Sequence, residues 1–309
     1  MLTGLSRDSL GPSPQRGLKQ GFWGGHGEKQ RAAQRSSADH RSEPARPPSP
    51  KLESVARRCW VTMTRDPSLD ELWEAMPPGE RAFAPGPLMG LPDPARRYLE
   101  HAIGPGTRLA SAVRLRMHGE IKLKRWLPFS AEQVLRRDGG MIWRATVRMH
   151  GMLVRGFDRL VDGKGAMRWK LLGIVPLITA AGADLTRSAT GRVAVESVWL
   201  PSVLCNDVSW TALDSSHAHA SFTVLGERVE LVFTVDDQGR LESVKLKRWG
   251  NPEGGEFHYV DFGGFVEAEG TFGGYTIPTR LRVGWYFGSE RFESEGEFFR
   301  VTIDEARYR

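Results

Sequence analysis

The segment Val113-Arg-Leu-Arg-Met-His-Gly-Glu-Ile-Lys-Leu-Lys124 alternates apolar and polar side chains along nearly its whole length. Because successive side chains of a β-strand point to opposite faces, this pattern predicts a strand with one buried and one solvated face. Similar runs continue to the end of the chain, separated by turn signals such as Asp162-Gly-Lys-Gly165 and Asp236-Asp-Gln-Gly239. Each strand can pair with its neighbour in the chain, so the sequence predicts an antiparallel meander.

The predicted fold is mainly β, a large curled antiparallel sheet, or half-barrel, of about ten or eleven strands. One helical segment between Asp184 and Val203 interrupts the strands, and we expect it to be the central helix inside the curl. Two short helices are predicted before the sheet. A capping box, Ser68-Leu-Asp-Glu71, begins the first, and Asp93 as N-cap, followed by Pro94, begins the second.

Composition divides the chain near residue 62. Residues 1–62 contain 11 of the 43 basic and 5 of the 37 acidic side chains, which leaves 32 of each in the rest. They are rich in Gly, Pro, Ser and Arg without periodicity, and so predict a disordered basic tail. The helix start shortly after Met63 suggests that the tail is not native. We expect residues 63–90 to form a short helix and a Pro/Gly-rich linker, and residues 91–309 to form a single half-barrel domain.

The charge balance and the apolar segments exclude several classes of function. The predicted domain is formally neutral, which argues against nucleic-acid binding by the folded part. The longest apolar stretch, residues 171–183, contains Pro176 and is shorter than the about 20 residues of a membrane span. Neither Met1 nor Met63 begins a secretory signal. The sequence therefore predicts no membrane span and a cytoplasmic location.

Motifs for cofactors, metals and catalysis are absent from the sequence. It contains no dinucleotide fingerprint, no His-Glu-x-x-His, no Cys-x-x-Cys and no Gly-x-Ser-x-Gly. His217 and His219 share one face of a predicted strand, a spacing that can ligate a metal, but an exposed strand start after Asp214-Ser-Ser216 is the preferred interpretation. We therefore predict no cofactor, no metal and no assigned catalytic residue.

Tryptophan is abundant, and its positions suggest what the interior does. Six of the ten tryptophans fall in predicted strands or in the central helix: Trp143, Trp169, Trp199, Trp210, Trp249 and Trp285. These rings either fill a packed core or enclose a cavity for an apolar ligand. The leading hypothesis is non-enzymatic binding of a hydrophobic small molecule or lipid. The predicted ligand-binding residues are Trp143, Met149, Trp169, Glu196, Trp199, Trp285 and Arg148.

Glu196 supports three interpretations, because it shares the inward face of the helical segment and a buried carboxylate needs a partner or a proton. It can form an ion pair with a sheet arginine such as Arg144 or Arg148. It can anchor a ligand head group, or act as a general acid or base, with Asp158 and His150 as companions. A further alternative is a protein-interaction scaffold that uses the basic face between Arg114 and Lys124. Any protein partner is unknown.

Several motifs resemble an uncharacterised bacterial protein family of unknown function. The resemblance covers about Leu91 to Arg309. It is carried by Leu91-Pro-Asp-Pro-Ala-Arg-Arg-Tyr-Leu99, Trp126-Leu-Pro-Phe-Ser-Ala-Glu-Gln133, Leu171-Leu-Gly-Ile-Val-Pro176, Glu196-Ser-Val-Trp-Leu-Pro201 and Ile277-Pro-Thr-Arg280. In element order the chain is also similar to lipoprotein-localisation carriers, which are half-barrels closed by helices around a lipid cavity. Those carriers are exported, whereas the sequence shows no export signal.

Overall fold

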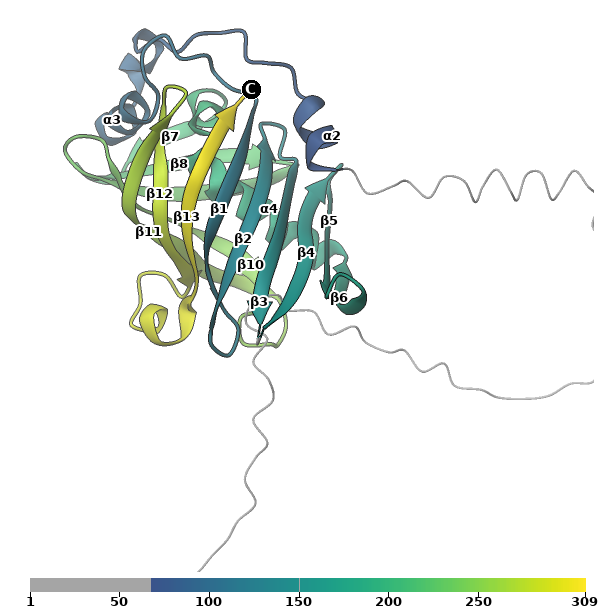
Figure 1. Ribbon diagram of the computed structural model, residues 1–309. Coiled ribbons are helices and arrows are strands. Elements are labelled where there is room, and N and C mark those ends of the chain that lie inside the picture. Colours follow the sequence, from purple (N-terminus) through teal and green to yellow (C-terminus); the bar gives the residue numbers. More distant parts are fainter. Residues whose placement is uncertain (1–67, 150) are drawn as a thin grey trace, which may run out of the picture.

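The computed structural model describes residues 68–149 and 151–309. The predicted tail of residues 1–62, the proposed start at Met63 and the side chain of His150 lie outside the described residues. The fold is a single antiparallel sheet of 13 strands, curled but not closed, in the order β6-β5-β4-β3-β2-β1-β13-β12-β11-β10-β9-β8-β7 (Figure 1). The predicted mainly β half-barrel is therefore confirmed, with more strands than expected.

The strands form two meanders, β1 to β6 and β7 to β13, which are joined where β1 pairs with β13, so that β6 and β7 are the two edges of the sheet. Their bounds are β1 (Ala112–Lys122), β2 (Trp126–Arg136), β3 (Met141–Met149), β4 (Met152–Val161), β5 (Lys164–Leu171), β6 (Val175–Ala181), β7 (Ser209–Ala212), β8 (His217–Val224), β9 (Glu227–Val235), β10 (Leu241–Gly250), β11 (His258–Phe272), β12 (Tyr275–Trp285) and β13 (Glu297–Tyr308). The helices are α2 (Leu69–Glu74), α3 (Asp93–Ala102) and α4 (Ala183–Val195). Shorter helical turns are η1 (Gly86–Gly90), η2 (Glu196–Trp199), η3 (Pro201–Cys205) and η4 (Phe292–Gly296).

The sequence missed β6. It lies in the apolar stretch 171–183, where Pro176 and the lack of alternation hid the strand pattern. A proline cannot donate a ladder hydrogen bond, so it is tolerated only where the strand has a free edge. β6 is such an edge strand, and nearly all its side chains are exposed on both faces.

The helix predicted between Asp184 and Val203 is shorter than expected. α4 ends at Val195, and two 3-10 turns follow it. It lies inside the curl and packs mainly against β10 and β5 (Figure 1). Glu196 is the C-cap of α4, not a residue of the predicted helical stripe.

The two N-terminal helices behave differently at their first turns. Ser68 caps α2 with the complete capping box that the sequence predicts. In α3 the N-cap is Pro92, and Asp93 is the first helical residue, where its carboxylate pairs with Arg96 and Arg97. Carboxylates in the first turn are favourable because of the helix dipole, so Asp93 stabilises the helix start without capping it.

The half-barrel has two unlike ends. At one, here called the helix end, α3 packs on the strands: the rings of Tyr98 and Phe233 are 5.0 Å apart, and Gly104 N donates to Gly274 O. The opposite end, here called the hairpin end, carries the turns β1–β2, β3–β4, β5–β6, β10–β11 and β12–β13. In Figure 1 the helix end is at the top and the hairpin end at the bottom.

The core lies between the concave face of the sheet and α4. Five of the six predicted interior tryptophans are buried in it: Trp143, Trp169, Trp199, Trp210 and Trp285. Trp249 is half-buried, and its Nε1 donates to Asp184. The tryptophan rings therefore mostly fill the interior. A smaller apolar cluster, formed by Leu69, Leu72, Val134 and Ile142, joins α2 to the outer face of the sheet.

Candidate functional site

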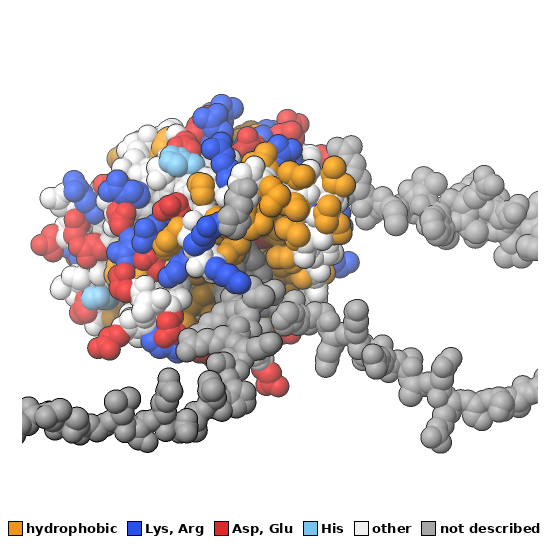
Figure 2. All heavy atoms as spheres, turned by 60° about the horizontal axis from the view of Figure 1, so that its bottom comes forward, with side chains coloured by type: hydrophobic (Ala, Val, Ile, Leu, Met, Phe, Trp, Pro, Cys, Tyr) orange, Lys and Arg blue, Asp and Glu red, His pale blue; other side chains and the backbone are white. Residues whose placement is uncertain are grey.

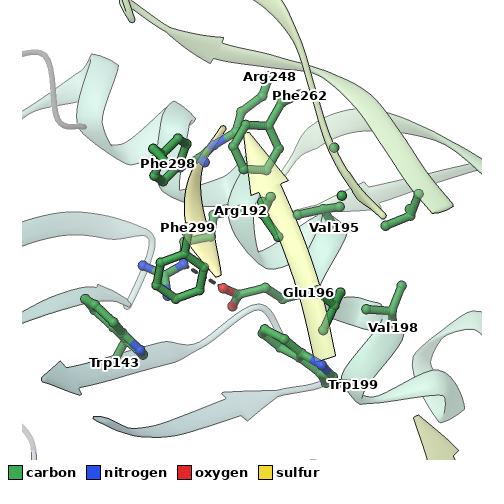
Figure 3. Close-up of a pocket in the computed structure, with 15 residues that line it drawn as sticks. Trp143, Arg192, Val195, Glu196, Val198, Trp199, Arg248, Phe262, Phe298 and Phe299 are labelled. Carbon is green, nitrogen blue, oxygen red and sulfur yellow. Dashed lines mark hydrogen bonds and ion pairs between the residues drawn. The ribbon is translucent and has the colours of Figure 1, made fainter. Parts of the chain in front are cut away.

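A cavity of about 70 Å³ remains between α4 and the concave face of the sheet (Figure 3). Its wall consists of Trp143, Arg192, Val195, Glu196, Val198, Trp199, Val244, Arg248, Phe262, Gly263, Gly264, Leu281, Val283, Phe298 and Phe299. Most of these side chains are apolar, and the charged ones come from α4, its C-cap and β10. The cavity therefore combines an aromatic wall with a few buried charges.

The aromatic wall is continuous with the hairpin end. Phe298 and Phe299 are the second and third residues of β13, and Phe299 pairs with Ile121 near the end of β1. The ring of Phe299 stacks on Phe129 at 5.0 Å and lies 6.1 Å from Trp143. These rings separate the cavity from the turns at the hairpin end.

On one side of the cavity, Arg192 forms a buried network with two carboxylates. Its Nε donates to Glu196 Oε1 at 2.6 Å, and its Nη1 donates to Asp158 Oδ2 at 3.1 Å. Gln133 Nε2 donates to Glu196 Oε2 at 2.6 Å. Burial lowers the pKa of Arg192, but Glu196 and Asp158 raise it by more, so the net shift is upward. Arg192 is therefore held charged by its partners.

Asp158 comes to this network from the inner face of β4. Trp169 Nε1 donates to its Oδ1 at 3.2 Å, and the absence of a side chain at Gly156 leaves room for the Trp169 ring. Burial raises the pKa of Asp158 to about 6, although Arg192 and Trp169 act in the opposite direction. Desolvation thus outweighs the ion pair at this carboxylate.

On the other side of the cavity, Arg248 is buried without a carboxylate partner. It is 4% exposed, its Nε donates to Ser188 O at 3.1 Å, and its guanidinium lies 4.5 Å from the centre of the Phe262 ring. Among the described residues no carboxylate lies within 4.0 Å of its nitrogens. Burial, followed by the charge of Arg192, lowers the pKa of Arg248 to about 9, whereas Glu196 and Asp158 raise it.

α4 has a glycine at the point where Arg248 crosses it. A Cβ at Gly191 would lie 3.1 Å from Arg248 Cγ, so the small residue lets the arginine stem lie against the helix. Glycine inside a helix costs about 1 kcal/mol relative to alanine, which marks positions with a packing reason. Here the packing reason is the contact of the Arg248 side chain with the helix at Gly191.

Several further polar atoms near the cavity lack partners among the described residues, including Nε1 of Trp285 and Oγ of Ser197. Trp143 Nε1 and Gln133 Oε1 are buried, and neither has a hydrogen-bond partner within the described part of the chain. A buried polar group without a partner is costly, so such groups often mark a place for water or a ligand. The Trp143 N–H is thus a donor without an acceptor on the wall of the same cavity as Arg248.

The structure brings together some of the predicted site residues and separates others. Trp143, Glu196 and Trp199 line the cavity. Trp169 and Trp285 are buried next to it, against Trp143 and Phe262 respectively. Met149 is half-buried where β3 reaches the hairpin end. These six residues are therefore on the concave side, but only three touch the cavity.

Two predictions about arginines are wrong. Arg148 is exposed on the outer face of β3, because it has the same strand parity as Arg144, so it does not reach the cavity. Glu196 pairs with Arg192 one turn earlier in the chain, and not with Arg144 or Arg148. Both oxygens of Glu196 accept hydrogen bonds, which favours the ion-pair interpretation of this residue over a general acid or base.

The basic face proposed for a scaffold is largely paired with acids. Arg114 contacts Asp70 and Glu132, Arg116 pairs with Glu305, and His118 with Asp304. This face is therefore not a uniformly positive surface.

Two cavity residues that the sequence analysis missed carried readable signals. Arg192 precedes Glu196 by four residues, the spacing of neighbours on one helix face. Arg248 has the same parity as the apolar residues Val244 and Leu246 on β10, which places it on the inner face. The contact between Phe299 and Trp143 had no such signal, because it joins strands far apart in the chain.

No group of three or more His, Cys, Asp or Glu side chains that could hold a metal ion occurs in residues 68–149 and 151–309. None of the helices in the same part of the chain combines the length and the apolar character needed to cross a membrane.

Comparison with known proteins identifies the family. The family of unknown function DUF6544 matches residues 81–294. The chain belongs to this family. The DUF6544 match confirms the resemblance to an uncharacterised family inferred from the sequence motifs. No curated protein matches the chain.

Two solved structures are similar to this DUF6544 protein. One is a putative outer membrane lipoprotein-sorting protein domain from Vibrio parahaemolyticus, with 7% identity and a TM-score of 0.36 over 64% of this chain and 86% of that chain. The other is a LolA superfamily protein from Nitrosomonas europaea, with 10% identity and a TM-score of 0.35 over 70% of this chain and 92% of that chain. At these identities and scores the similarity says nothing about function.

Proposed function

We propose that this DUF6544 protein binds a hydrophobic small molecule or lipid with an acidic head group, without chemical conversion, and that the head group occupies the cavity beside Arg248. The observation that carries the proposal is the buried guanidinium of Arg248, which lines an apolar cavity and has no carboxylate partner among the described residues. Burying a charge without a counter-charge is unfavourable. An anionic ligand would supply the missing charge.

The chemistry of the wall fits an anion. An arginine fork binds carboxylate and phosphate through parallel hydrogen bonds, and Nη1 of Arg248 makes no hydrogen bond to a described residue. The Trp143 N–H is a further donor on the cavity wall without an acceptor in the described part of the chain. Arg192, by contrast, is already engaged by Glu196 and Asp158.

The size of the cavity determines which part of a ligand it holds. At about 70 Å³ it is well below the roughly 300–1,000 Å³ of pockets that enclose a whole drug-sized ligand. It accommodates a head group, and a longer apolar chain must continue past Phe298 and Phe299. Those rings adjoin the hairpin end, so we infer that the chain of the ligand leaves the cavity in that direction.

A pair of probes that differ only in charge tests the proposal. Oleate and oleyl alcohol have the same hydrocarbon chain, but only oleate is an anion at pH 7. We expect the full chain to bind oleate more tightly than oleyl alcohol in calorimetric titrations. Arg248→Met should weaken oleate binding about tenfold or more, since hydrogen bonds to charged groups are worth about 1.5–3 kcal/mol.

Two further variants control for structural effects. Arg248→Lys keeps the positive charge and should retain part of the preference for oleate. Arg228→Met removes an arginine that is 74% exposed on its side chain and is outside the cavity, and should bind like the parent chain. Equal affinity for the two probes in the parent chain, or unchanged oleate binding by a folded Arg248→Met, would refute the acidic head group. Failure to bind either probe would refute the binding function itself.

A further inference from the structure

Three turns lie in a row along one half of the hairpin end: β1–β2, β3–β4 and β5–β6. They share this end because β1 to β6 form an uninterrupted antiparallel meander, in which every second turn falls on the same side. With neighbouring strands about 4.8 Å apart, successive turns of this row are separated by about 10 Å. The row therefore presents three protrusions of the sheet side by side.

Each of these turns exposes large apolar side chains. They are Leu123 in the first turn, Met152 at the second, and Leu172, Ile174 and Val175 at the third. Ile174 is 77% exposed, the highest value of any large apolar side chain in residues 68–149 and 151–309. Figure 2 shows a hydrophobic patch on the side of the molecule that carries β5 and β6 in Figure 1, with basic side chains at its margin.

The same turns carry basic side chains and no acidic ones. Their basic residues are Lys122, Lys124, Arg125, Arg148, Arg155 and Lys170. Residues 121–131, 148–157 and 170–181 contain neither Asp nor Glu. No carboxylate of a described residue lies within 4.0 Å of any of these six side chains. We call these five apolar and six basic side chains the tip surface.

The other half of the hairpin end has the opposite charge. Its turns, residues 251–257 and 286–296, contain five acidic side chains and one basic one, Arg291. The acidic residues are Glu253, Glu256, Glu290, Glu293 and Glu295. The hairpin end is thus divided, and an anionic surface would attract one half and repel the other.

We propose that the tip surface docks on the surface of an anionic lipid bilayer. Apolar side chains at the ends of the turns can enter the boundary between head groups and acyl chains. The basic side chains are set among and behind them, where long stems let the charges reach lipid phosphates. The acidic turns would be repelled by the anionic surface. The half-barrel would therefore bind with the turns β1–β2, β3–β4 and β5–β6 toward the bilayer.

The structure argues against addition of a strand from another chain at the same place. Edge strand β6 contains Pro176, which lacks an N–H, and the pairing of β5 with β6 is shifted between Trp169 and Lys170. Proline and irregular pairing are devices that discourage pairing of one sheet edge with another. A bilayer needs no backbone hydrogen bonds from β6.

This inference does not depend on the ligand cavity, and the experiment uses different residues. The full chain would be sedimented with vesicles of phosphatidylcholine alone and with vesicles containing one-third phosphatidylglycerol. We expect binding only to the anionic vesicles and weaker binding at high salt. Lys124→Glu combined with Arg125→Glu should lower the partition coefficient about 30-fold, and Ile174→Asp about tenfold.

A matched variant at the helix end provides the control. Leu213 is 59% exposed in the turn between β7 and β8, and Leu213→Asp makes the same kind of change there as Ile174→Asp makes in the tip surface. It should leave vesicle binding unchanged. Residues 1–62 are the same in all variants, so any binding by that basic segment cancels in the comparison.

Three results would overturn the proposal. The first is equal binding of the parent chain and the tip-surface variants to anionic vesicles. The second is absence of binding to either kind of vesicle. The third is a dimer in light scattering that Ile174→Asp dissociates without any effect on vesicle binding, which would assign the tip surface to a second copy of the chain.

Discussion

Two buried arginines, Arg192 on α4 and Arg248 on β10, line the same cavity, and their surroundings differ (Figure 3). Arg192 on α4 is matched by Glu196 and Asp158, and its net pKa shift is upward. Arg248 on β10 rests on the Phe262 ring and on the backbone of Ser188, and its pKa is lowered to about 9, mainly by burial. One charge is neutralised within the fold and the other is not.

The difference teaches how a fold can separate structural from functional charge. A buried ion pair contributes little net stability compared with an apolar replacement, but removing one partner leaves a costly unpaired charge. Arg192 cannot be lost without such a cost. In the ligand-free protein no carboxylate of a described residue pairs with Arg248 to offset its desolvation penalty. Its replacement should therefore change the free energy of unfolding little. Its charge remains available for an anion.

The largest effect should follow loss of Arg192. Arg192→Met leaves Asp158 and Glu196 buried without their cation, and we expect the free energy of unfolding to fall by about 3–5 kcal/mol. Chemical denaturation at pH 7 measures it. The control is Arg187→Met on the same helix, whose exposed pair with Glu227 should contribute less than about 1 kcal/mol. Equal losses of unfolding free energy in Arg192→Met and Arg187→Met would show that the buried network of Arg192 is no more important for stability than an exposed ion pair.

A smaller effect should appear as a pH dependence at Asp158. Its folded pKa of about 6 lies above the ordinary value near 4, so the folded state holds this proton more tightly than the unfolded state. This stabilising contribution is present below about pH 4 and is lost as the pH rises through about 6. Two pKa units correspond to about 2–3 kcal/mol.

Asp158→Asn isolates that contribution. We expect the free energy of unfolding of the parent chain to fall relative to the variant by about 2–3 kcal/mol between pH 4 and pH 7. Denaturation curves of both proteins across this range provide the measurement. A difference that stays constant with pH would mean that Arg192 keeps Asp158 ionised over the whole range. The charge of Arg192 would then be balanced by two carboxylates even at pH 4.

The smallest effect should follow loss of Arg248. Arg248→Met replaces a buried cation by an apolar side chain of similar length, and we expect the unfolding free energy of the ligand-free chain to change by about 1 kcal/mol or less. Thermal and chemical unfolding after removal of bound lipid would measure it. A loss as large as that of Arg192→Met would show that both arginines are structural.

The sequence was sufficient for the architecture because strand periodicity is a local property. The alternation that begins at Val113 predicted the antiparallel meander, and the capping box at Ser68 predicted the first helix turn. β6 escaped prediction because an edge strand that is exposed on both faces has no reason to alternate. The extent of α4 was overestimated, since the two 3-10 turns after Val195 continue its helical pattern.

The candidate site was predictable only in part. Trp143, Glu196 and Trp199 were expected at the cavity and line it. Arg148 was expected there but lies on the outer face, because the alternation of Trp143, Ala145 and Val147 puts the arginines of β3 on the opposite side. Arg248 was not expected, although its strand parity points inward. Docking on a bilayer and a cytoplasmic location remain predictions.

The sequence by itself determined which residues form strands and which faces of those strands are apolar, since both follow from the period of the backbone. It also determined that residues 63–309 are formally neutral. Only the tertiary structure decided which charges meet inside: Asp158, Gln133 and Arg192 come from β4, β2 and α4, and nothing local in the chain specifies their contact. The reason is that partner choice depends on the curl of the whole sheet around one helix, which brings together residues separated by tens of positions in sequence.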